Sequence, residues 1–137
     1  MYKPNSFELY ELLCKSDYEE LKDNQFAWSL FDERMLRDIQ HLRELFGKVT
    51  INDWKWGGDN QWRGLRNPAS KWYSRTSQHS WGRAADLIFE ETTAESVRQY
   101  ILANPLEFEI KRMERDVSWL HIDYFNTGAV SIKLFSA

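Results

Sequence analysis

The spacing of apolar residues changes along this chain, and that change is the feature that most restricts its fold. From Asp32 to Phe46, apolar side chains recur every three or four residues, as on one face of a helix, and Gly47 favours a helix end. The last third alternates apolar and polar residues, which predicts strands at about 108–114, 118–125 and 129–135. Helices separated from a terminal antiparallel meander indicate an α+β domain, in which N-terminal helices pack on a mainly antiparallel sheet.

Capping residues and alternation predict the remaining elements. Asn5 and Ser16 each stand three residues before a glutamate, the spacing of a capping box, and predict short helices at about 6–14 and 17–23. The other predicted elements are a strand at 48–54, a strand at 83–89 and a helix from Thr92 to Asn104.

The length and composition of the chain suit one domain with one core. Its 137 residues are 42% hydrophobic, enough to bury a core in a single domain spanning 1–137. The net charge of −3 provides no general positive field, so we expect no nucleic-acid partner. Cys14 is the single cysteine, which excludes an internal disulfide. No run resembles a signal peptide or a membrane span, so we expect a protein that is cytoplasmic as synthesised, without membrane insertion. We also expect a monomer.

The segment from Gln61 to Arg83 has the composition of a functional loop. It carries no acidic residue. Its basic residues and tryptophans are Arg63, Arg66, Lys71, Arg75, Arg83, Trp62, Trp72 and Trp81. An irregular stretch of this length in a small domain is usually functional, or it hides an element that periodicity does not reveal. Interleaved tryptophans and arginines also suit single-stranded nucleic acid, an alternative that the net negative charge disfavours.

Two histidines and an aspartate are the candidates for chemistry. His79 and Asp86 flank the start of the predicted strand at 83–89, and His121 lies in the strand at 118–125. If these strands are neighbours, a metal ion fits between them. Two imidazoles and one carboxylate leave a fourth position open, which is the arrangement of catalytic zinc sites. The alternative is that the histidines are hydrogen-bonded structural residues.

The residues around these candidates match two motifs of one enzyme family. The first stretch resembles the pattern Ser-x-His-x-x-Gly-x-Ala-x-Asp of the zinc D-alanyl-D-alanine carboxypeptidase and murein endopeptidase family, and Trp119 with His121 resembles its Trp-x-His motif. The resemblance covers roughly residues 30–125 and is closest to compact members from bacteriophages and prophages. The residues that match the first pattern are Ser77, His79, Gly82, Ala84 and Asp86.

The resemblance implies a zinc peptidase that acts on peptidoglycan. His79, Asp86 and His121 would bind Zn²⁺, and a nearby carboxylate would take a proton from the attacking water and give one to the leaving amine. The substrate would be a peptidoglycan peptide, cut at a D-alanyl-D-alanine end or within the stem peptide. Such an enzyme would act on the cell wall after release, as an endolysin, or as part of a phage particle.

The carboxylate that moves the proton has two candidates. Many relatives carry it three residues before the second histidine, where this chain has Ser118. Compact relatives carry a glutamate at the end of the preceding strand, which matches Glu114, and Asp116 is the second candidate. Alternation puts Glu114 on the same face as the apolar Phe108 and Ile110, pointing inward. The alternative is that these acids belong to a solvated, charged hairpin end.

Further side chains are expected to bind the substrate or to support the ligands. A guanidinium can bind a carboxylate through two hydrogen bonds, and we expect Arg75 to reach the pocket, with Arg66 as the next candidate. Ser77 would orient a ligand or bind the substrate. Asp123 would hold a histidine ring or a backbone amide, and Trp119 would wall the site. The alternative for Arg75 and Asp123 is simple exposure to solvent.

Two functions follow from these residues. The leading hypothesis is a zinc-dependent metallopeptidase that hydrolyses a peptide bond in peptidoglycan. The other is a metal-binding module without catalysis, with a structural or wall-recognition role, and its motivation is Ser118 in the place of an acid. Histidine and carboxylate ligands also accept other divalent metals, so the choice of zinc depends on the resemblance.

Overall fold

The helix predicted from the apolar stripe is present as α2, Glu33–Phe46, and the sheet packs against it. A computed structural model describes all 137 residues. Asp32 caps α2 by accepting a hydrogen bond from the Arg34 N–H at 2.9 Å, and Gly47 ends the helix with a φ of 80°. Both ends of α2 therefore lie where the sequence predicts them.

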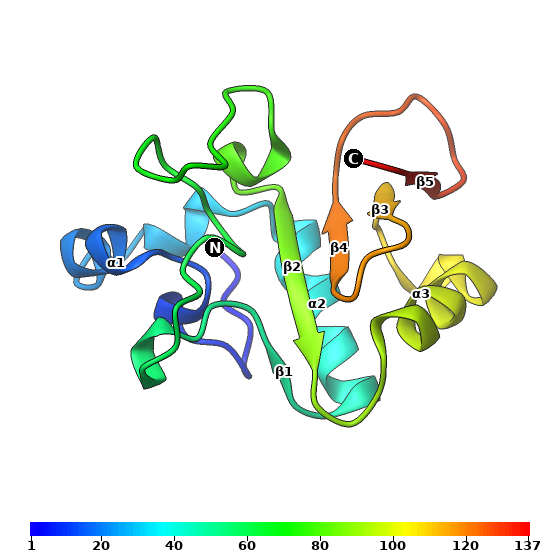
Figure 1. Ribbon diagram of the computed structural model, residues 1–137, viewed down its shortest axis with the longest axis horizontal. Coiled ribbons are helices and arrows are strands. Elements are labelled where there is room, and N and C mark those ends of the chain that lie inside the picture. The colour runs from blue at the N-terminus through cyan, green and yellow to red at the C-terminus, as the bar shows by residue number, and fades with distance from the viewer.

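Three helices and a five-stranded sheet make up the regular structure (Figure 1). The helices are α1 Lys15–Leu21, α2 Glu33–Phe46 and α3 Ala94–Ala103. The strands are β1 Val49–Thr50, β2 Ala84–Phe89, β3 Arg112–Glu114, β4 Leu120–Asp123 and β5 Lys133–Phe135. The predicted α+β class is confirmed. None of the helices combines the length and the apolar character needed to cross a membrane.

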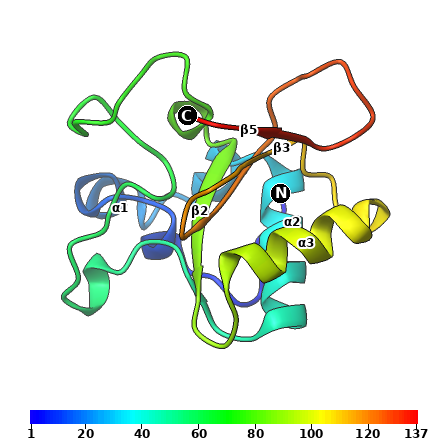
Figure 2. The same cartoon turned by 45° about the vertical axis from the view of Figure 1, so that its right-hand side comes forward.

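The sheet has the strand order β1-β2-β4-β3-β5, and every pair is antiparallel except β3 with β5. The predicted terminal meander is therefore wrong for its last strand. After β4 the chain crosses to the outer edge of β3, where the Lys133 N–H donates to the Lys111 carbonyl at 2.9 Å. Figure 2 shows β5 beside β3. The last three strands are also shorter than alternation predicts.

Alternate residues of the central strands face opposite sides of the sheet. One side, the core face, packs against α2 and α3, and Figure 1 shows α2 running behind β2. The buried side chains of the core face are Ala85, Leu87, Met113, Leu120 and Ile122. The other side, the site face, carries Asp86, Arg112, Glu114, His121 and Asp123. The polar residues of the predicted site thus share one side of the sheet.

The N-terminal segment differs from the predicted pair of helices. The first predicted helix, 6–14, is only a 3-10 turn at Leu9–Glu11, and α1 begins after Cys14. The carbonyls of Leu12 and Leu13 accept hydrogen bonds from other parts of the chain, at 2.9 to 3.0 Å. These bonds tie the residues after the 3-10 turn to the segment at 52–65, and the chain is extended at Cys14 before α1 begins.

Two further elements keep their predicted place with shifted ends. The predicted strand 48–54 belongs to the sheet only at β1, because the Asn52 N–H donates to the Glu11 carbonyl at 2.9 Å instead of continuing the ladder. The helix α3 is capped by Thr93, whose hydroxyl accepts the Ser96 N–H at 3.1 Å, rather than by Thr92.

The long loop at 61–83 has one 3-10 turn, Gln78–Trp81, and is otherwise irregular, as predicted. It runs alongside β2, where the Asp86 N–H donates to the Arg63 carbonyl at 2.8 Å.

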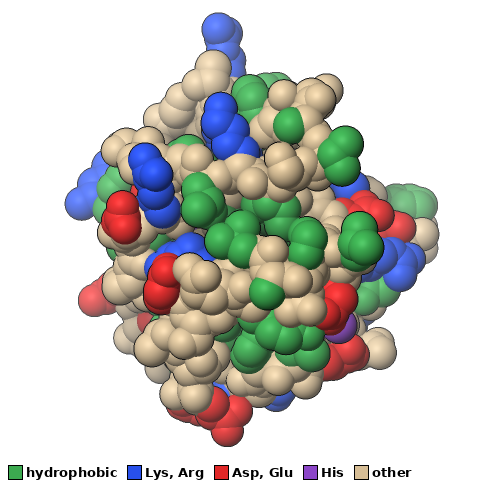
Figure 3. All heavy atoms as spheres, turned by 90° about the vertical axis from the view of Figure 1, so that its right-hand side faces the viewer, with side chains coloured by type: hydrophobic (Ala, Val, Ile, Leu, Met, Phe, Trp, Pro, Cys, Tyr) green, Lys and Arg blue, Asp and Glu red, His purple; other side chains and the backbone are tan.

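On a different side of the molecule, around α3 and β5, hydrophobic side chains lie among polar ones (Figure 3). The exposed large hydrophobic residues of the chain beyond α3 are Leu106, Phe125, Val130 and Leu134.

Candidate metal centre

The three predicted ligands come together in one buried group. Asp86 on β2 and His121 on β4 are direct partners across the sheet, and His79 approaches from the 3-10 turn before β2. Their ligand atoms lie within 4.8 Å of one another. His121 Nδ1 is 2.8 Å from Asp86 Oδ1, and His79 Nε2 is 3.3 Å from the same oxygen. The two strands are neighbours, which is the condition that the predicted site requires.

His79 is held with one ring nitrogen directed at Asp86. Ser77 Oγ accepts the His79 N–H at 3.3 Å, and Gly82 ends the turn in the left-handed region, with a φ of 67°. On the ring, Nδ1 lies 2.9 Å from the Gly64 carbonyl, so Nδ1 must carry the proton and donate it. The lone pair is then on Nε2, the atom that faces Asp86 and can bind a metal.

His121 lies between two carboxylates. Its Nδ1 is 2.8 Å from Asp86 and its Nε2 is 2.8 Å from Asp123, which Arg112 also binds through both Nε and Nη2. Burial alone would lower the pKa of His121, but its hydrogen bonds to Asp123 and Asp86 raise the pKa to about 9. Burial would raise the pKa of Asp86, and the two histidines hold it well below its ordinary value. A divalent cation can replace the proton on His121 Nδ1 while Nε2 still donates to Asp123.

The donor set fits a metal ion. Two imidazole nitrogens and one carboxylate oxygen are ligands of zinc and of other divalent transition metals, and a tetrahedral ion would have one position left over. The three residues are buried, and the group could hold a metal ion, whose identity these donors do not select. Asp123, fully buried, holds the His121 ring and also accepts the Phe125 N–H at 3.2 Å, so both contacts predicted for it are present.

A cavity of about 450 Å³ opens beside the metal-binding group. Arg66, Glu114 and Trp119 line it together with Asp86. Arg66 lies 3.4 Å from Asp86 Oδ2 and donates through Nε to the Trp62 carbonyl at 2.8 Å. Burial lowers the pKa of Arg66, and the charges of Asp86 and Glu114 act in the opposite direction. The cavity brings a carboxylate, a guanidinium and an indole to the edge of the three ligands.

Glu114 lies in this cavity for a different reason from the predicted one. Phe108, Ile110 and Met113 are all in the hydrophobic core, so strict alternation breaks before Met113. Glu114 follows Met113 and therefore faces away from the core, not inward with Phe108 and Ile110. One residue further along the β3–β4 register, it lies next to His121 on the site face.

Two predicted residues lie outside the cavity. Asp116 is exposed in a turn, with a φ of 63°, and does not line the cavity. Arg75 is also exposed, and its backbone carbonyl accepts the Trp81 indole N–H at 2.7 Å. The prediction that Arg75 reaches the pocket is therefore wrong. Arg66 reaches the pocket instead. Its backbone N–H donates to the His79 carbonyl at 3.1 Å, which holds this part of the loop beside the ligands.

Comparisons of this chain with protein-family models, with curated proteins and with solved structures found no match.

Arg98 supports the site and was not indicated by the sequence patterns. It lies on α3, is 4% exposed, and donates to the carbonyls of Trp119 at 2.9 Å and Val117 at 2.8 Å. Glu95 accepts from its Nε at 2.8 Å. These bonds hold the turn between β3 and β4, and with it Glu114. A basic residue within the apolar stripe of the predicted helix was the signal that could have found it.

Proposed function

We propose that this protein is a metal-dependent peptidase, with Zn²⁺ as the metal and a peptidoglycan peptide as the substrate. The observation that carries the proposal is the convergence of His79, Asp86 and His121 at the edge of a cavity that also holds Glu114 and Arg66. Three protein ligands with one open position are typical of catalytic zinc sites, whereas structural sites use four. The two motifs shared with zinc D-alanyl-D-alanine carboxypeptidases and murein endopeptidases support zinc, the substrate and a phage or prophage role in wall cleavage.

Each residue has a task in this chemistry. His79, Asp86 and His121 would hold Zn²⁺, which would supply a Lewis acid that polarises the scissile carbonyl and lowers the pKa of the attacking water. Glu114 would take a proton from the water and give one to the leaving amine, since its carboxylate lines the cavity without a hydrogen-bonded partner. Arg66 would orient the substrate through Nη1, which makes no hydrogen bond in the protein. Asp123 would keep His121 in the orientation that presents Nδ1.

Mass spectrometry of muropeptides tests this proposal. The full chain would be stripped of metal with a chelator, reloaded with Zn²⁺, and incubated with purified muropeptides. We expect new fragments from the unaltered protein and none from His79→Ala. Glu114→Gln should retain zinc and lose hydrolysis by about 10²–10⁴-fold. Asp116→Asn is the matched control, because it removes an exposed carboxylate close by in sequence and should leave the rate unchanged.

A metal-binding module without catalysis is the second candidate function. Ser118, at the place where many members of the resembled family carry the acid, is exposed and offers no carboxylate. In that case the unaltered protein and Glu114→Gln would both bind zinc, and neither would release fragments from muropeptides of several wall chemistries. That result would contradict the peptidase proposal.

A further inference from the structure

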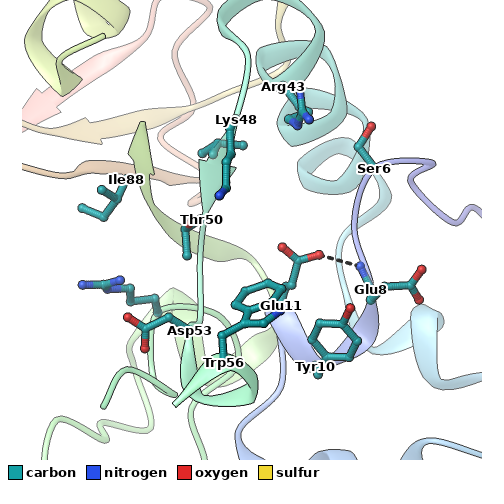
Figure 4. A pocket seen from close by; sticks show the side chains of 12 residues that line it. Ser6, Glu8, Tyr10, Glu11, Arg43, Lys48, Thr50, Asp53, Trp56 and Ile88 are labelled. Atoms are coloured by element: carbon teal, nitrogen blue, oxygen red, sulfur yellow. Dashed lines mark hydrogen bonds between the residues drawn. The ribbon is translucent and has the colours of Figure 1, made fainter. Parts of the chain in front are cut away.

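A second and larger cavity, of about 810 Å³ (Figure 4), shares lining residues with the cavity beside the metal-binding group. Arg63 and Ile88 line both cavities. Ile88 is two residues after Asp86 on β2, so both side chains lie on the site face. A ligand bound at the metal centre can therefore continue along β2 into the second cavity.

One side of this second cavity is cationic. Arg43, in the last turn of α2, and Lys48, just before β1, both line it. The half-buried Arg43 guanidinium forms no hydrogen bond and no ion pair, whereas Lys48 contacts Glu90 at 3.7 Å. Figure 4 shows the Lys48 side chain extending into the cavity. A half-buried guanidinium without a partner is suited to bind a carboxylate through two hydrogen bonds.

Glu11 supplies the opposite charge to the same cavity. It is 8% exposed, and its Oε2 accepts the Glu8 N–H at 2.8 Å, which fixes the side chain (Figure 4). The other carboxylate oxygen has no hydrogen-bond donor in the protein. Burial raises the pKa of Glu11, and the Glu8 N–H and the charge of Arg43 offset this rise only in part. An ammonium group in the cavity would provide a close cationic partner.

An apolar wall completes the cavity. Tyr10 and Trp56 pack edge to face, with ring centroids 5.7 Å apart, and both line the cavity beside Glu11. Such rings offer apolar surface on which methylene groups pack. The cavity thus combines a site for a carboxylate, a site for an ammonium group and a surface for an aliphatic chain.

We propose that this cavity binds a zwitterionic amino-acid end, with an ammonium and a carboxylate on one carbon atom, carried on an aliphatic side chain. Arg43 binds the carboxylate, Glu11 binds the ammonium group, and Tyr10 and Trp56 pack on the methylene groups. The second amino-acid centre of a diaminopimelate residue has this chemistry. That this residue belongs to the peptide cut at the metal centre rests on the proposed function, whereas the binding site itself does not.

Isothermal titration calorimetry with the metal-free full chain tests the site without hydrolysis. The probe is meso-diaminopimelic acid with one amino-acid centre blocked by acetyl and amide groups, so that only the other centre is zwitterionic. We expect binding that weakens about tenfold or more in Arg43→Met and in Glu11→Gln, because each removes a charged hydrogen-bonding group. The matched control is Arg37→Met, since Arg37 is an exposed arginine of the same helix that pairs with Glu33. This variant should bind as the unaltered chain does.

A second probe keeps the test independent of how the variants fold. Blocked lysine, with an acetylated α-amino group and an amidated carboxyl group, has the ammonium group and the aliphatic chain but no carboxylate. It should bind the unaltered chain at least about tenfold more weakly than the diaminopimelate probe does. Equal binding of both probes, no binding of the diaminopimelate probe, or full binding by the folded Arg43→Met and Glu11→Gln variants would each overturn the proposal. Because no metal is present, failure of muropeptide hydrolysis would not change these outcomes, and failure of the probe to bind would not affect the test of hydrolysis.

Discussion

The two faces of the central sheet use neighbouring residues of the same strands for different ends. On β2, Leu87 points into the core and is fully buried, while Asp86 and Ile88 on either side of it point to the site face. The core face is apolar and packs against helices, whereas the site face holds His121 between the carboxylates of Asp86 and Asp123. Residues that stabilise the fold and residues of the site therefore lie one position apart on the same strand. Substitutions at neighbouring positions can test stability and metal binding independently.

A second contrast concerns two buried aspartates. Asp86 has two imidazoles as partners, and its pKa lies well below the ordinary value despite burial. Asp38 on α2 has only neutral donors, the Tyr124 hydroxyl at 2.5 Å and the Glu109 N–H at 3.0 Å, and burial raises its pKa to about 6. On the site face, the histidine partners compensate the cost of burying a charged carboxylate. Beneath the core face, neutral hydrogen bonds compensate this cost only in part.

The largest expected effect is on stability, from the core face. Leu87→Ala should lower the free energy of unfolding by about 2–5 kcal/mol, because it opens a cavity among close-packed side chains. Ile88→Ala, on the half-buried site face, should cost clearly less. Urea denaturation of both variants measures the difference, and equal losses would contradict the separation of the two faces.

Metal binding should stabilise the protein through the site face. Zinc at about 100 times its Kd should raise the free energy of unfolding by about 2.7 kcal/mol, since the unfolded chain has no assembled site. His121→Ala should abolish this increment, and Leu87→Ala should retain it. Thermal unfolding with and without zinc measures the increment, and an unchanged response in His121→Ala would show that the metal binds elsewhere.

Arg98 is buried on α3 and holds the turn next to Glu114. Arg98→Met should cost about 1–3 kcal/mol, because the carbonyls of Val117 and Trp119 lose their charged donor. Turnover should fall while zinc affinity stays the same, since the change moves Glu114 and leaves the three ligands in place. Denaturation, muropeptide kinetics and zinc titration separate these effects. A loss of zinc affinity equal to the loss of turnover would show that Arg98 does not act through Glu114.

Removing the Asp123 carboxylate that holds His121 should weaken metal binding without removing a ligand. Asp123→Asn should reduce zinc affinity by about 10–100-fold, because the carboxylate that holds the ring through Nε2 is lost. Competition with a coloured chelator measures the change. Asp116→Asn should leave zinc affinity unchanged and serves as the control for loss of one negative charge.

The pH dependence contributed by Asp38 is spread over about two pH units and has a small slope at any one pH. Its pKa of about 6 exceeds the ordinary value of 3.8, so between these values the folded protein binds more protons than the unfolded chain. The free energy of unfolding from this group therefore falls as the pH rises from about 4 to 6, by less than about 1.4 kcal/mol per pH unit. Asp38→Asn keeps an acceptor for Tyr124 and should lack this slope. Denaturation of both proteins across this range gives the difference, and parallel curves would contradict the raised pKa.

The sequence predicted those parts of the fold and site that depend on nearby residues. The apolar stripe and caps of α2, the alternation of β2, and the spacing that brings His79 and Asp86 to one end of a strand are all local patterns. The site at His79, Asp86 and His121 also required that β2 and β4 be neighbours, and the structure has them as direct partners. Short-range periodicity is sufficient for the helix and the strand, because neighbouring residues supply most of their interactions, whereas the pairing of β2 with β4 entered the prediction only as a condition of the site.

Tertiary structure alone decided the features that depend on contacts distant in the sequence. The crossover to the far edge of β3 makes β5 parallel and brings Phe135 within 5.5 Å of the His121 ring. A break in alternation turns Glu114 to the site face, and a backbone bond to His79 selects Arg66 over Arg75. Each outcome depends on hydrogen bonds or packing between separate segments. Local patterns along the chain do not reveal these contacts, because the same local pattern is compatible with several long-range partners.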